Sequence, residues 1–237
     1  MEPASSFNRS PARQLAGRAR AAGSNLRRTG LRVWLFYLPG PGPRLMSWLR
    51  KRWVLFRNPH AHIEFNGPVY LGPRFSLDMP RGGTFIVGPG VEFRRDFRAE
   101  LADRDARITI GAGCAFTYGV VIQCGTSIDI GEHCVFAQGV MIVDGSHRFR
   151  DIEHPTLTQG YEFRPIVVGD HVSAMSKATV IANIGERTFV GAGAVVTRPL
   201  PGFCVVAGVP ARVIDYFGPP GQEPPEVARS ASAETAG

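Results

Sequence analysis

A histidine in a polar loop between two runs of short repeats is the first candidate for chemistry in this sequence. His147 lies in the segment Asp144-Gly-Ser-His147-Arg-Phe149, and six-residue repeats occur on both sides of it. Stacked repeats have no room in their core for the insert at 144–165, so this loop must project to the surface. A titratable imidazole on a loop that a rigid scaffold supports is a candidate active site. The alternative interpretation is a surface histidine in an ordinary loop.

The repeats themselves predict the fold. The clearest copies begin at Ile110, Phe116, Ile122, Ile130, Phe136, Val168, Ala174, Ile184 and Val190, and weaker copies begin at Leu71 and Val87. Three short strands, each with one aliphatic residue pointing inward, form a triangular coil with glycine or small polar residues at its corners. Because glycine recurs in every coil and β-branched residues are frequent, a helical fold is excluded. We therefore expect an all-β solenoid over residues 61–217 with a core column of Ile, Val and Ala.

Positive charge is concentrated in residues 1–60, which hold 12 Lys and Arg against one acid, Glu2. The rest of the chain holds 15 basic and 19 acidic residues, so the pI of 9.7 describes the N-terminal segment. Arginine alternates with Leu, Trp and Phe over 12–57, and two short helices over 12–30 and 43–56 fit this pattern. One interpretation is a helix that caps the solenoid, and the other is a cationic amphipathic contact with an anionic membrane. Arginines with aromatic residues also suit nucleic acid, but we expect no nucleic-acid partner.

The first residues of the sequence and its apolar runs bear on location. It opens on Met1-Glu2-Pro3, without an apolar stretch before a cleavage-like site. The longest apolar run, Val33–Leu38, is much shorter than the ~20 residues that cross a bilayer. We expect a cytoplasmic protein, with residues 12–57 as its candidate peripheral contact with the inner membrane face.

The composition of 218–237, rich in Pro, Ala, Ser and Glu, predicts a disordered tail.

The four cysteines show no spacing typical of metal sites. They are Cys114, Cys124, Cys134 and Cys204. The separation of Cys114 from Cys134 could stack them on successive coils. In a reducing compartment we expect free thiols that fill the core.

Three segments carry a resemblance to a known family. They are Asp144–Phe149; Gln159-Gly160 leading to Pro165–Asp170; and Val190–Arg198 followed by Val206–Ile214. Over 110–214 the sequence resembles the hexapeptide-repeat acyltransferases, within them the galactoside, maltose and xenobiotic O-acetyltransferase group, and most closely the sugar O-acetyltransferases of polysaccharide gene clusters. The resemblance implies a left-handed parallel β-helix, acetyl-CoA as acyl donor, and a homotrimer with active sites between subunits.

The resemblance also implies roles for individual residues. His147 matches the general base, which removes a proton from an acceptor hydroxyl that attacks the thioester. Asp144 would orient His147 or hold the acceptor, unless it forms an Asx turn that shapes the loop. Thr117 and Gln159 are candidates for contacting the acceptor, with Glu162 as a supporting residue. The positions that match contacts to acetyl-CoA are Ser176, Ala192, Thr197, Arg198 and Arg212. Guanidinium groups suit the phosphates of CoA, although each arginine can equally be a surface charge and Ala192 part of a tight turn.

The sequence departs from this family's pattern beside the expected CoA groove. Ser173 replaces a tryptophan, Ala174-Met175 replaces the usual Ile-Gly start of a hexad, and Val180–Asn183 is a shortened repeat. Thr117 and Gly125 occupy positions where the galactoside enzymes carry polar Asn and Asp. These changes leave the acceptor, and the choice between acetyl and a longer acyl group, open.

Three functions are consistent with these observations. The leading hypothesis is a CoA-dependent O-acyltransferase that acts on a hydroxyl of a sugar or glycoconjugate. A non-catalytic scaffold or membrane adaptor is an alternative, because 173–183 departs from the family pattern. A zinc lyase similar to the γ-class carbonic anhydrases would need three converging imidazoles. His133, His147 and His154 offer that number without the close histidine pair, so we expect no metal.

Overall fold

The computed structural model of this chain describes residues 41–225. Contacts divide the chain into two units, Met1–Leu49 and Arg50–Gly237. The helix α2 (Pro41–Arg57) corresponds to the helix expected over 43–56, while the helix expected over 12–30 lies outside the described residues. None of the helices in residues 41–225 is both long and apolar enough to span a membrane.

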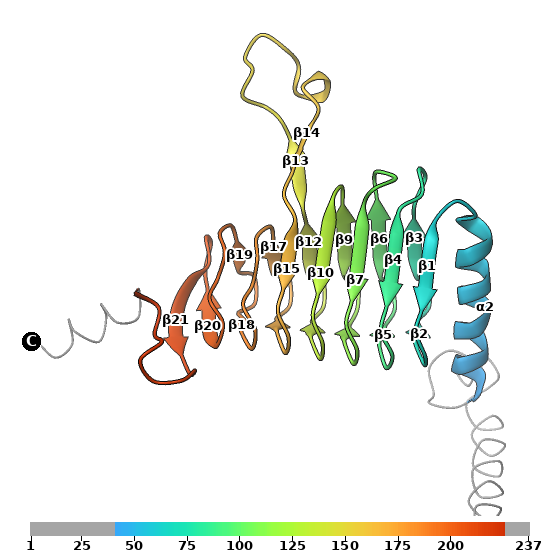
Figure 1. The fold of residues 1–237 in the computed structure, drawn as a ribbon, viewed down its shortest axis with the longest axis horizontal. Helices are drawn as coiled ribbons and strands as arrows, with labels where there is room; N and C mark the ends of the chain where they lie inside the picture. The colour runs from blue at the N-terminus through green and yellow to red at the C-terminus, as the bar shows by residue number, and fades with distance from the viewer. Residues whose placement is uncertain (1–40, 226–237) are drawn as a thin grey trace, which may run out of the picture. The chain divides into compact units, whose positions relative to one another are not determined.

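The second unit contains a solenoid of three sheets whose strands follow one another in turn around each coil (Figure 1). The first sheet contains β1 (His62–Phe65), β4 (Thr84–Val87), β7 (Arg107–Ile110), β10 (Ser127–Ile130) and β15 (Ile166–Val168). The second sheet contains β2 (Tyr70–Leu71), β5 (Glu92–Phe93), β8 (Ala115–Phe116), β11 (Val135–Phe136), β16 (Ser173–Ala174), β18 (Phe189–Val190), β20 (Cys204–Ala207) and β21 (Arg212–Tyr216). The third sheet contains β3 (Ser76–Asp78), β6 (Arg98–Leu101), β9 (Val121–Cys124), β12 (Met141–Val143), β17 (Thr179–Val180) and β19 (Val195–Val196).

Strands within each sheet pair in parallel, except that β21 runs antiparallel to β20. Equivalent positions of successive coils lie in register, so that Ile108, Ile128 and Ile166 are direct neighbours. This register keeps every inward aliphatic residue on the core side, since a slip of one residue would turn it to solvent. The predicted all-β, left-handed parallel β-helix is confirmed.

The three turns of each coil form three columns along the solenoid. We call them the first corner, between the first and second sheets; the second corner, between the second and third; and the third corner, between the third and the next first-sheet strand. Residues at the first corner, including His133 and His171, adopt the left-handed conformation, with φ of 54° and 58°.

The core contains a stack of phenylalanines that the repeat pattern did not predict. Phe93, Phe116 and Phe136 occupy equivalent positions of β5, β8 and β11 and are fully buried. The centroids of Phe93 and Phe116 are 5.0 Å apart, and those of Phe116 and Phe136 are 4.9 Å apart. Ala174 takes the equivalent place in β16, so the core narrows in the coil that contains the shortened repeat. The expected column of Ile, Val and Ala therefore describes the later coils better than the earlier ones.

All four cysteines are free and buried, as predicted. Cys114 and Cys134 do lie on successive coils, where the Cys134 N–H donates to the Cys114 sulfur at 3.4 Å. Burial is the main cause that raises the pKa of Cys124, and the nearby carboxylate of Asp144 raises it further. These thiols therefore serve the packing of the core.

The last part of α2, from Arg50 to Arg57, packs on the first coil of its own unit. Val54 belongs to the buried core, and the guanidinium of Arg50 donates to the carbonyl oxygen of Leu71 at 2.8 Å. The side-chain amide of Asn58 donates to the carbonyl oxygen of Leu77 at 3.3 Å. These contacts support the capping interpretation for residues 50–57. At the other end, the structure describes 218–225 of the tail that was predicted to be disordered over 218–237, and there the hydroxyl of Tyr216 donates to the carbonyl oxygen of Pro219 at 3.0 Å. The rest of this tail, 226–237, lies outside the described residues.

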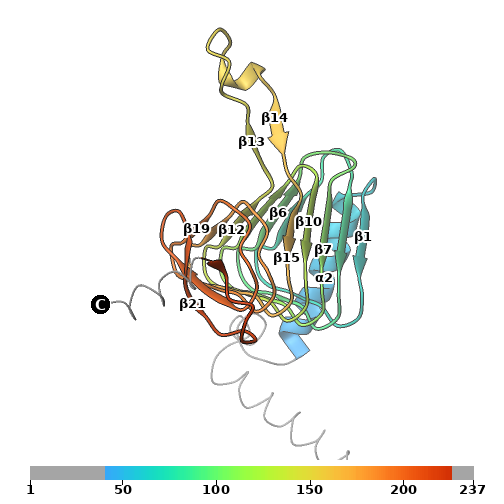
Figure 2. The same ribbon diagram turned by 60° about the vertical axis from the view of Figure 1, so that its left-hand side comes forward.

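The insert at 144–165 projects from the third corner, as expected (Figures 1 and 2). Its base is a regular hairpin rather than an irregular loop. Strands β13 (Gly145–His147) and β14 (Tyr161–Phe163) pair antiparallel, and the short 3-10 helix η1 (Thr156–Thr158) lies in the tip. The hairpin fixes the direction in which its side chains point, because alternate residues of a strand face opposite sides.

Candidate active site

His147 lies at the end of β13, directly opposite Tyr161 of β14. Their ring centroids are 4.3 Å apart with an interplanar angle of 35°. The Nδ1 atom of His147 is buried and has no hydrogen-bond partner within residues 41–225. A buried ring nitrogen without a partner is uncommon in folded proteins and, where it occurs, can mark a functional group.

An aromatic row continues from His147 to the body of the solenoid. The rings of Tyr161 and Phe163 stack with centroids 5.6 Å apart. The ring of Phe163 rests on two glycines, Gly125 of the preceding coil and Gly145 of β13, and a Cβ on either glycine would overlap it. The aromatic row therefore anchors the hairpin to the coil that precedes it, and only the absence of side chains at these two positions allows the contact.

Substituting Gly125 with alanine is expected to displace the Phe163 ring and to lower activity with little loss of stability. The ring is 38% exposed, so it can move outward, but the hairpin base then shifts with His147. A misplacement of about 1 Å at a reacting group can cost about 100-fold in rate. Steady-state kinetics and thermal unfolding of Gly125→Ala provide the measurement. The same substitution in a Phe163→Ala background is the control, because there it should cause no further loss; an equal loss in both backgrounds would contradict the contact.

Asp144 lies beneath the hairpin at the third corner and is 4% exposed. One carboxylate oxygen accepts a hydrogen bond from the Gly125 N–H and the other from the Thr126 N–H, each at 2.7 Å. The Cys124 thiol also donates to this carboxylate at 3.5 Å. These bonds use both oxygens to shape the turn of the preceding coil. This structural role differs from the Asx turn considered for Asp144, because the carboxylate binds the preceding coil and not its own loop. A direct contact with His147 or the acceptor stays a prediction.

The five residues expected to contact acetyl-CoA lie around the strand β19. Ser176 and Ala192 stack at the second corner, where the Gly193 N–H donates to the Ser176 carbonyl oxygen at 2.9 Å. Thr197 and Arg198 follow the other end of β19 at the third corner, and both are exposed. Arg212 begins β21, and its neighbour Ala211 donates its N–H to the Val195 carbonyl oxygen of β19 at 2.8 Å.

The residues around β19 fit the chemistry of CoA. At the corner with Ala192, Gly193 has a φ of 69°, and open space lies where its Cβ would be. This bare edge leaves room for an extended chain such as a pantetheine arm. Arg198 and Arg212 are exposed guanidinium groups, which bind phosphate well. The contacts of these five residues with CoA remain predictions.

Thr117 and Gln159 are not brought close to each other. Thr117 follows β8 at the second corner, and its Oγ1 atom is buried without a hydrogen-bond partner among the described residues. Gln159 lies in the hairpin tip, where its side-chain amide donates to the carbonyl oxygens of Asp151 and His154 at 2.8 and 2.7 Å. Within one chain, Thr117 lies at the second corner, whereas the hairpin that carries Gln159 projects from the third corner. Glu162 pairs with Arg164 at 2.6 Å, and this hydrogen bond lowers the pKa of Glu162.

The histidines considered for zinc do not converge within this chain. His133 stacks on His171 at the first corner, with ring centroids 5.4 Å apart. His154 pairs with Asp151 in the hairpin tip at 2.9 Å, away from His133. Residues 41–225 contain no group of three or more His, Cys, Asp or Glu side chains placed to hold a metal ion.

Comparison with known proteins places the fold among acetyltransferases. No known family profile matches the sequence. The chain is 26% identical over 168 residues to a probable acetyltransferase of Mycobacterium tuberculosis, covering 69% of this chain and 55% of that protein. It is 35% identical over 118 residues to a serine acetyltransferase of Synechococcus elongatus, covering 47% of this chain and 44% of that protein. The chain thus spans about half the length of the curated relatives that it matches.

Solved structures with this fold include acetyltransferases that bind CoA. A hexapeptide-repeat acetyltransferase of Vibrio cholerae, complexed with acetyl-CoA, has a TM-score of 0.52 and 20% identity over 90% of this chain and 94% of that one. A galactoside acetyltransferase in complex with CoA has a TM-score of 0.50 and 19% identity over 89% and 86% of the two chains. The polysialic acid O-acetyltransferase OatWY has a TM-score of 0.51 and 20% identity over 70% and 83%. By sequence and by fold, this chain is similar to the hexapeptide-repeat acetyltransferases.

Proposed function

We propose that this chain is a CoA-dependent O-acyltransferase that transfers an acetyl group to a hydroxyl of a sugar or glycoconjugate. The observation that carries the proposal is His147, held on a projecting hairpin with a buried ring nitrogen that lacks a partner in residues 41–225. Because Nδ1 is closed off from solvent, the acceptor hydroxyl would meet the other ring nitrogen, Nε2. The structures of a galactoside acetyltransferase and a polysialic acid O-acetyltransferase with this fold support a sugar as acceptor.

In the proposed mechanism, His147 accepts the proton of the acceptor hydroxyl as its oxygen attacks the acyl carbonyl. It returns the proton to the sulfur of CoA as the carbon–sulfur bond breaks and CoA leaves as the thiol. Acetyl-CoA supplies the activated thioester. The Tyr161 ring, tilted by 35° against the imidazole, would fix the orientation of that imidazole, and Phe163 would fix the hairpin on the solenoid. Proton transfer of this kind depends on the position of the base, so these contacts matter as much as the histidine itself.

The proposed donor site lies on the coils that follow the hairpin. The bare corner at Ser176 and Ala192 would receive the pantetheine arm, with Thr197 at the other end of β19. Arg198 and Arg212 would neutralise phosphate groups through charge-assisted hydrogen bonds. Placement of the donor there leaves the coils that precede the hairpin for the acceptor.

We further propose a homotrimer in which neighbouring copies complete the site. The hairpin tip exposes large apolar side chains that a monomer would leave in water: Phe149 is 63%, Ile152 92% and Leu157 81% exposed. A group of exposed apolar side chains on one projection is typical of an interaction surface. Location in the cytoplasm, with 12–57 as the candidate membrane contact, belongs to the same proposal.

The test is release of CoA from acetyl-CoA by the purified protein, across a panel of sugars and lipid-linked sugars. Transfer to a hydroxyl predicts CoA release that depends on the acceptor, together with a base-labile ester in the product. Longer acyl-CoA thioesters in the same assay identify the donor. A folded oligomer that releases no CoA and does not bind it in calorimetry would contradict the proposal and favour a scaffold.

A further inference from the structure

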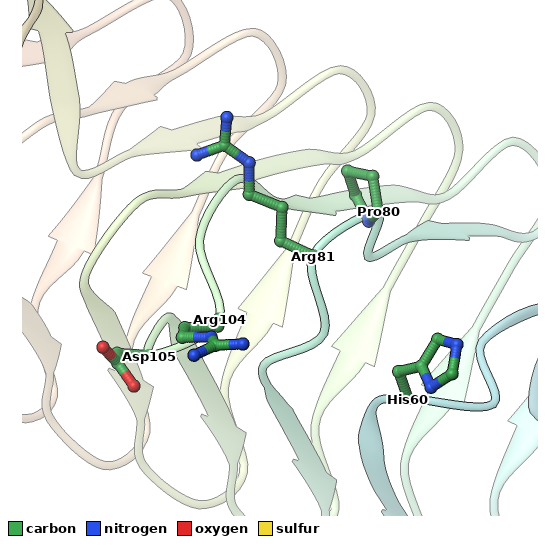
Figure 3. A pocket seen from close by; sticks show the side chains of 5 residues that line it. All are labelled: His60, Pro80, Arg81, Arg104 and Asp105. Carbon is green, nitrogen blue, oxygen red and sulfur yellow. The ribbon is translucent and has the colours of Figure 1, made fainter.

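An open pocket lies on the same corner of the solenoid as the hairpin, toward the N-terminus. It has a volume of about 550 Å³ and is lined by His60, Pro80, Arg81, Arg104 and Asp105 (Figure 3). We call it the arginine pocket. Its two arginines come from the turns that follow β3 and β6, which are successive turns of the third corner.

The arginine pocket is close to the base of the hairpin along the solenoid axis. The turn of Arg104 is hydrogen-bonded to the next turn of the corner, where the Ala102 N–H donates to the Cys124 carbonyl oxygen and the Arg107 N–H to that of Thr126. That next turn also contains Gly125 and Thr126, whose N–H groups donate to the carboxylate of Asp144 at the start of the hairpin. Neighbouring strands lie about 4.8 Å apart, so the Arg104 turn lies about 10 Å from Asp144 along the axis.

The aromatic row extends from the hairpin toward the arginine pocket. Phe163 leans from β14 onto Gly125, and Gly125 lies in the turn next to that of Arg104. The rings of Phe163, Tyr161 and His147 thus form a continuous surface from one coil beside the arginine pocket to the imidazole. The apolar faces of a sugar ring pack well on such a surface, and its hydroxyls then point toward the polar groups at either end.

The chemistry of the arginine pocket suits an anion. Arg104 is exposed and makes no hydrogen bond or ion pair with the residues between 41 and 225. Arg81 has one ion pair, to Asp103 at 3.8 Å, and both side chains are largely exposed, which makes the pair weak. The guanidinium of Arg104 can bind an oxyanion through paired hydrogen bonds, while that of Arg81 points away from it (Figure 3) and adds positive charge to the pocket. The carboxylate of Asp105 can accept hydrogen bonds from sugar hydroxyls.

The hairpin therefore separates the turns of the third corner into two groups, those of the coils that follow it and those of the coils that precede it. Thr197 and Arg198 lie on the coils that follow it, in the region assigned above to the acyl donor. The arginine pocket lies on the coils that precede it. We propose that the arginine pocket binds an oxyanion group of the acceptor, a phosphate or a carboxylate, while a hydroxyl of the same molecule reaches His147. This inference rests on the proposed function and narrows its acceptor to an anionic sugar.

The experiment compares three acceptors built on one sugar: the neutral methyl glycoside, the phosphate monoester and the uronic acid. CoA release is measured with the wild-type protein, Arg104→Ala and Arg94→Ala. Arg94 is an exposed arginine that follows β5 at the second corner, so it serves as the matched control. The KM of the wild type should be lower for a charged acceptor than for the neutral one. Arg104→Ala should raise that KM by about 10- to 100-fold, with kcat and the neutral KM unchanged.

The two charged acceptors distinguish a phosphate from a carboxylate as the bound group. Equal KM values for neutral and charged acceptors, or a parallel change for all three in Arg104→Ala, would overturn the inference while leaving the proposed function intact. A complete lack of CoA release would instead count against the proposed function. In that case, calorimetry with glucose 6-phosphate and glucuronate tests the pocket by itself, and binding that does not depend on Arg104 would overturn the inference.

Discussion

Replacing His147 with alanine is expected to lower kcat for acyl transfer by about 100- to 10,000-fold, which is the range for loss of a general base. The imidazole ends β13 on a hairpin outside the core, so its removal should leave the solenoid folded. The KM for acetyl-CoA should change little, because the proposed donor residues lie on other coils. Steady-state CoA release and thermal unfolding measure the two effects separately.

The matched control for this variant is His154→Ala. His154 lies in the same insert, is exposed, and pairs with Asp151 at 2.9 Å. Its loss should leave kcat close to the wild-type value. A His147→Ala protein with wild-type kcat would remove the assignment of the base. A similar loss in both variants would show that the order of the insert, rather than proton transfer, limits the rate.

The solenoid could be predicted from the sequence because its signals are local. A large apolar residue begins most of the six-residue repeats and sets the strand, and the Ile-Gly or Val-Gly pair that recurs once in each coil sets a turn. Copies such as Ile110 and Ile130 therefore define the register by themselves. The projection of 144–165 follows from the same pattern, because an insert has no place in a stacked core. The regular β13–β14 hairpin at its base was not predicted, since Gly145–His147 is too short to show alternation.

The contacts that position His147 join residues that are far apart in the sequence. Asp144 binds the amides at 125 and 126, and Phe163 packs on Gly125. No spacing within one repeat predicts such pairs, because they depend on which coils are stacked. The glycine at 125, a departure from the pattern that the resemblance implies, was a usable signal that another group fills that place. The pairing of the turns of Arg81 and Arg104 was missed for the same reason, since their repeats are the least regular ones.

Replacing Asp144 with alanine is expected to destabilise the solenoid by about 3–5 kcal/mol. Its carboxylate is 4% exposed and accepts two hydrogen bonds of 2.7 Å from backbone N–H groups. A hydrogen bond to a charged group contributes about 1.5–3 kcal/mol, and removal of the acceptor leaves both N–H groups without a partner. Denaturant unfolding at one fixed protein concentration for all variants measures the free energy of unfolding, because assembly would make stability depend on concentration.

Asp129→Ala is the matched control, because Asp129 lies on the neighbouring first-sheet strand and also binds two groups, the side chains of Arg107 and Thr109. Its partners are side chains near the surface, so the expected loss is about 1 kcal/mol or less. A much larger loss for Asp144→Ala than for Asp129→Ala would establish that Asp144 shapes the turn beneath the hairpin. If Asp144→Ala were instead as stable as the wild type but lost kcat, the structural role would be wrong. A loss of kcat at unchanged stability would instead support a contact of the carboxylate with His147 or with the acceptor.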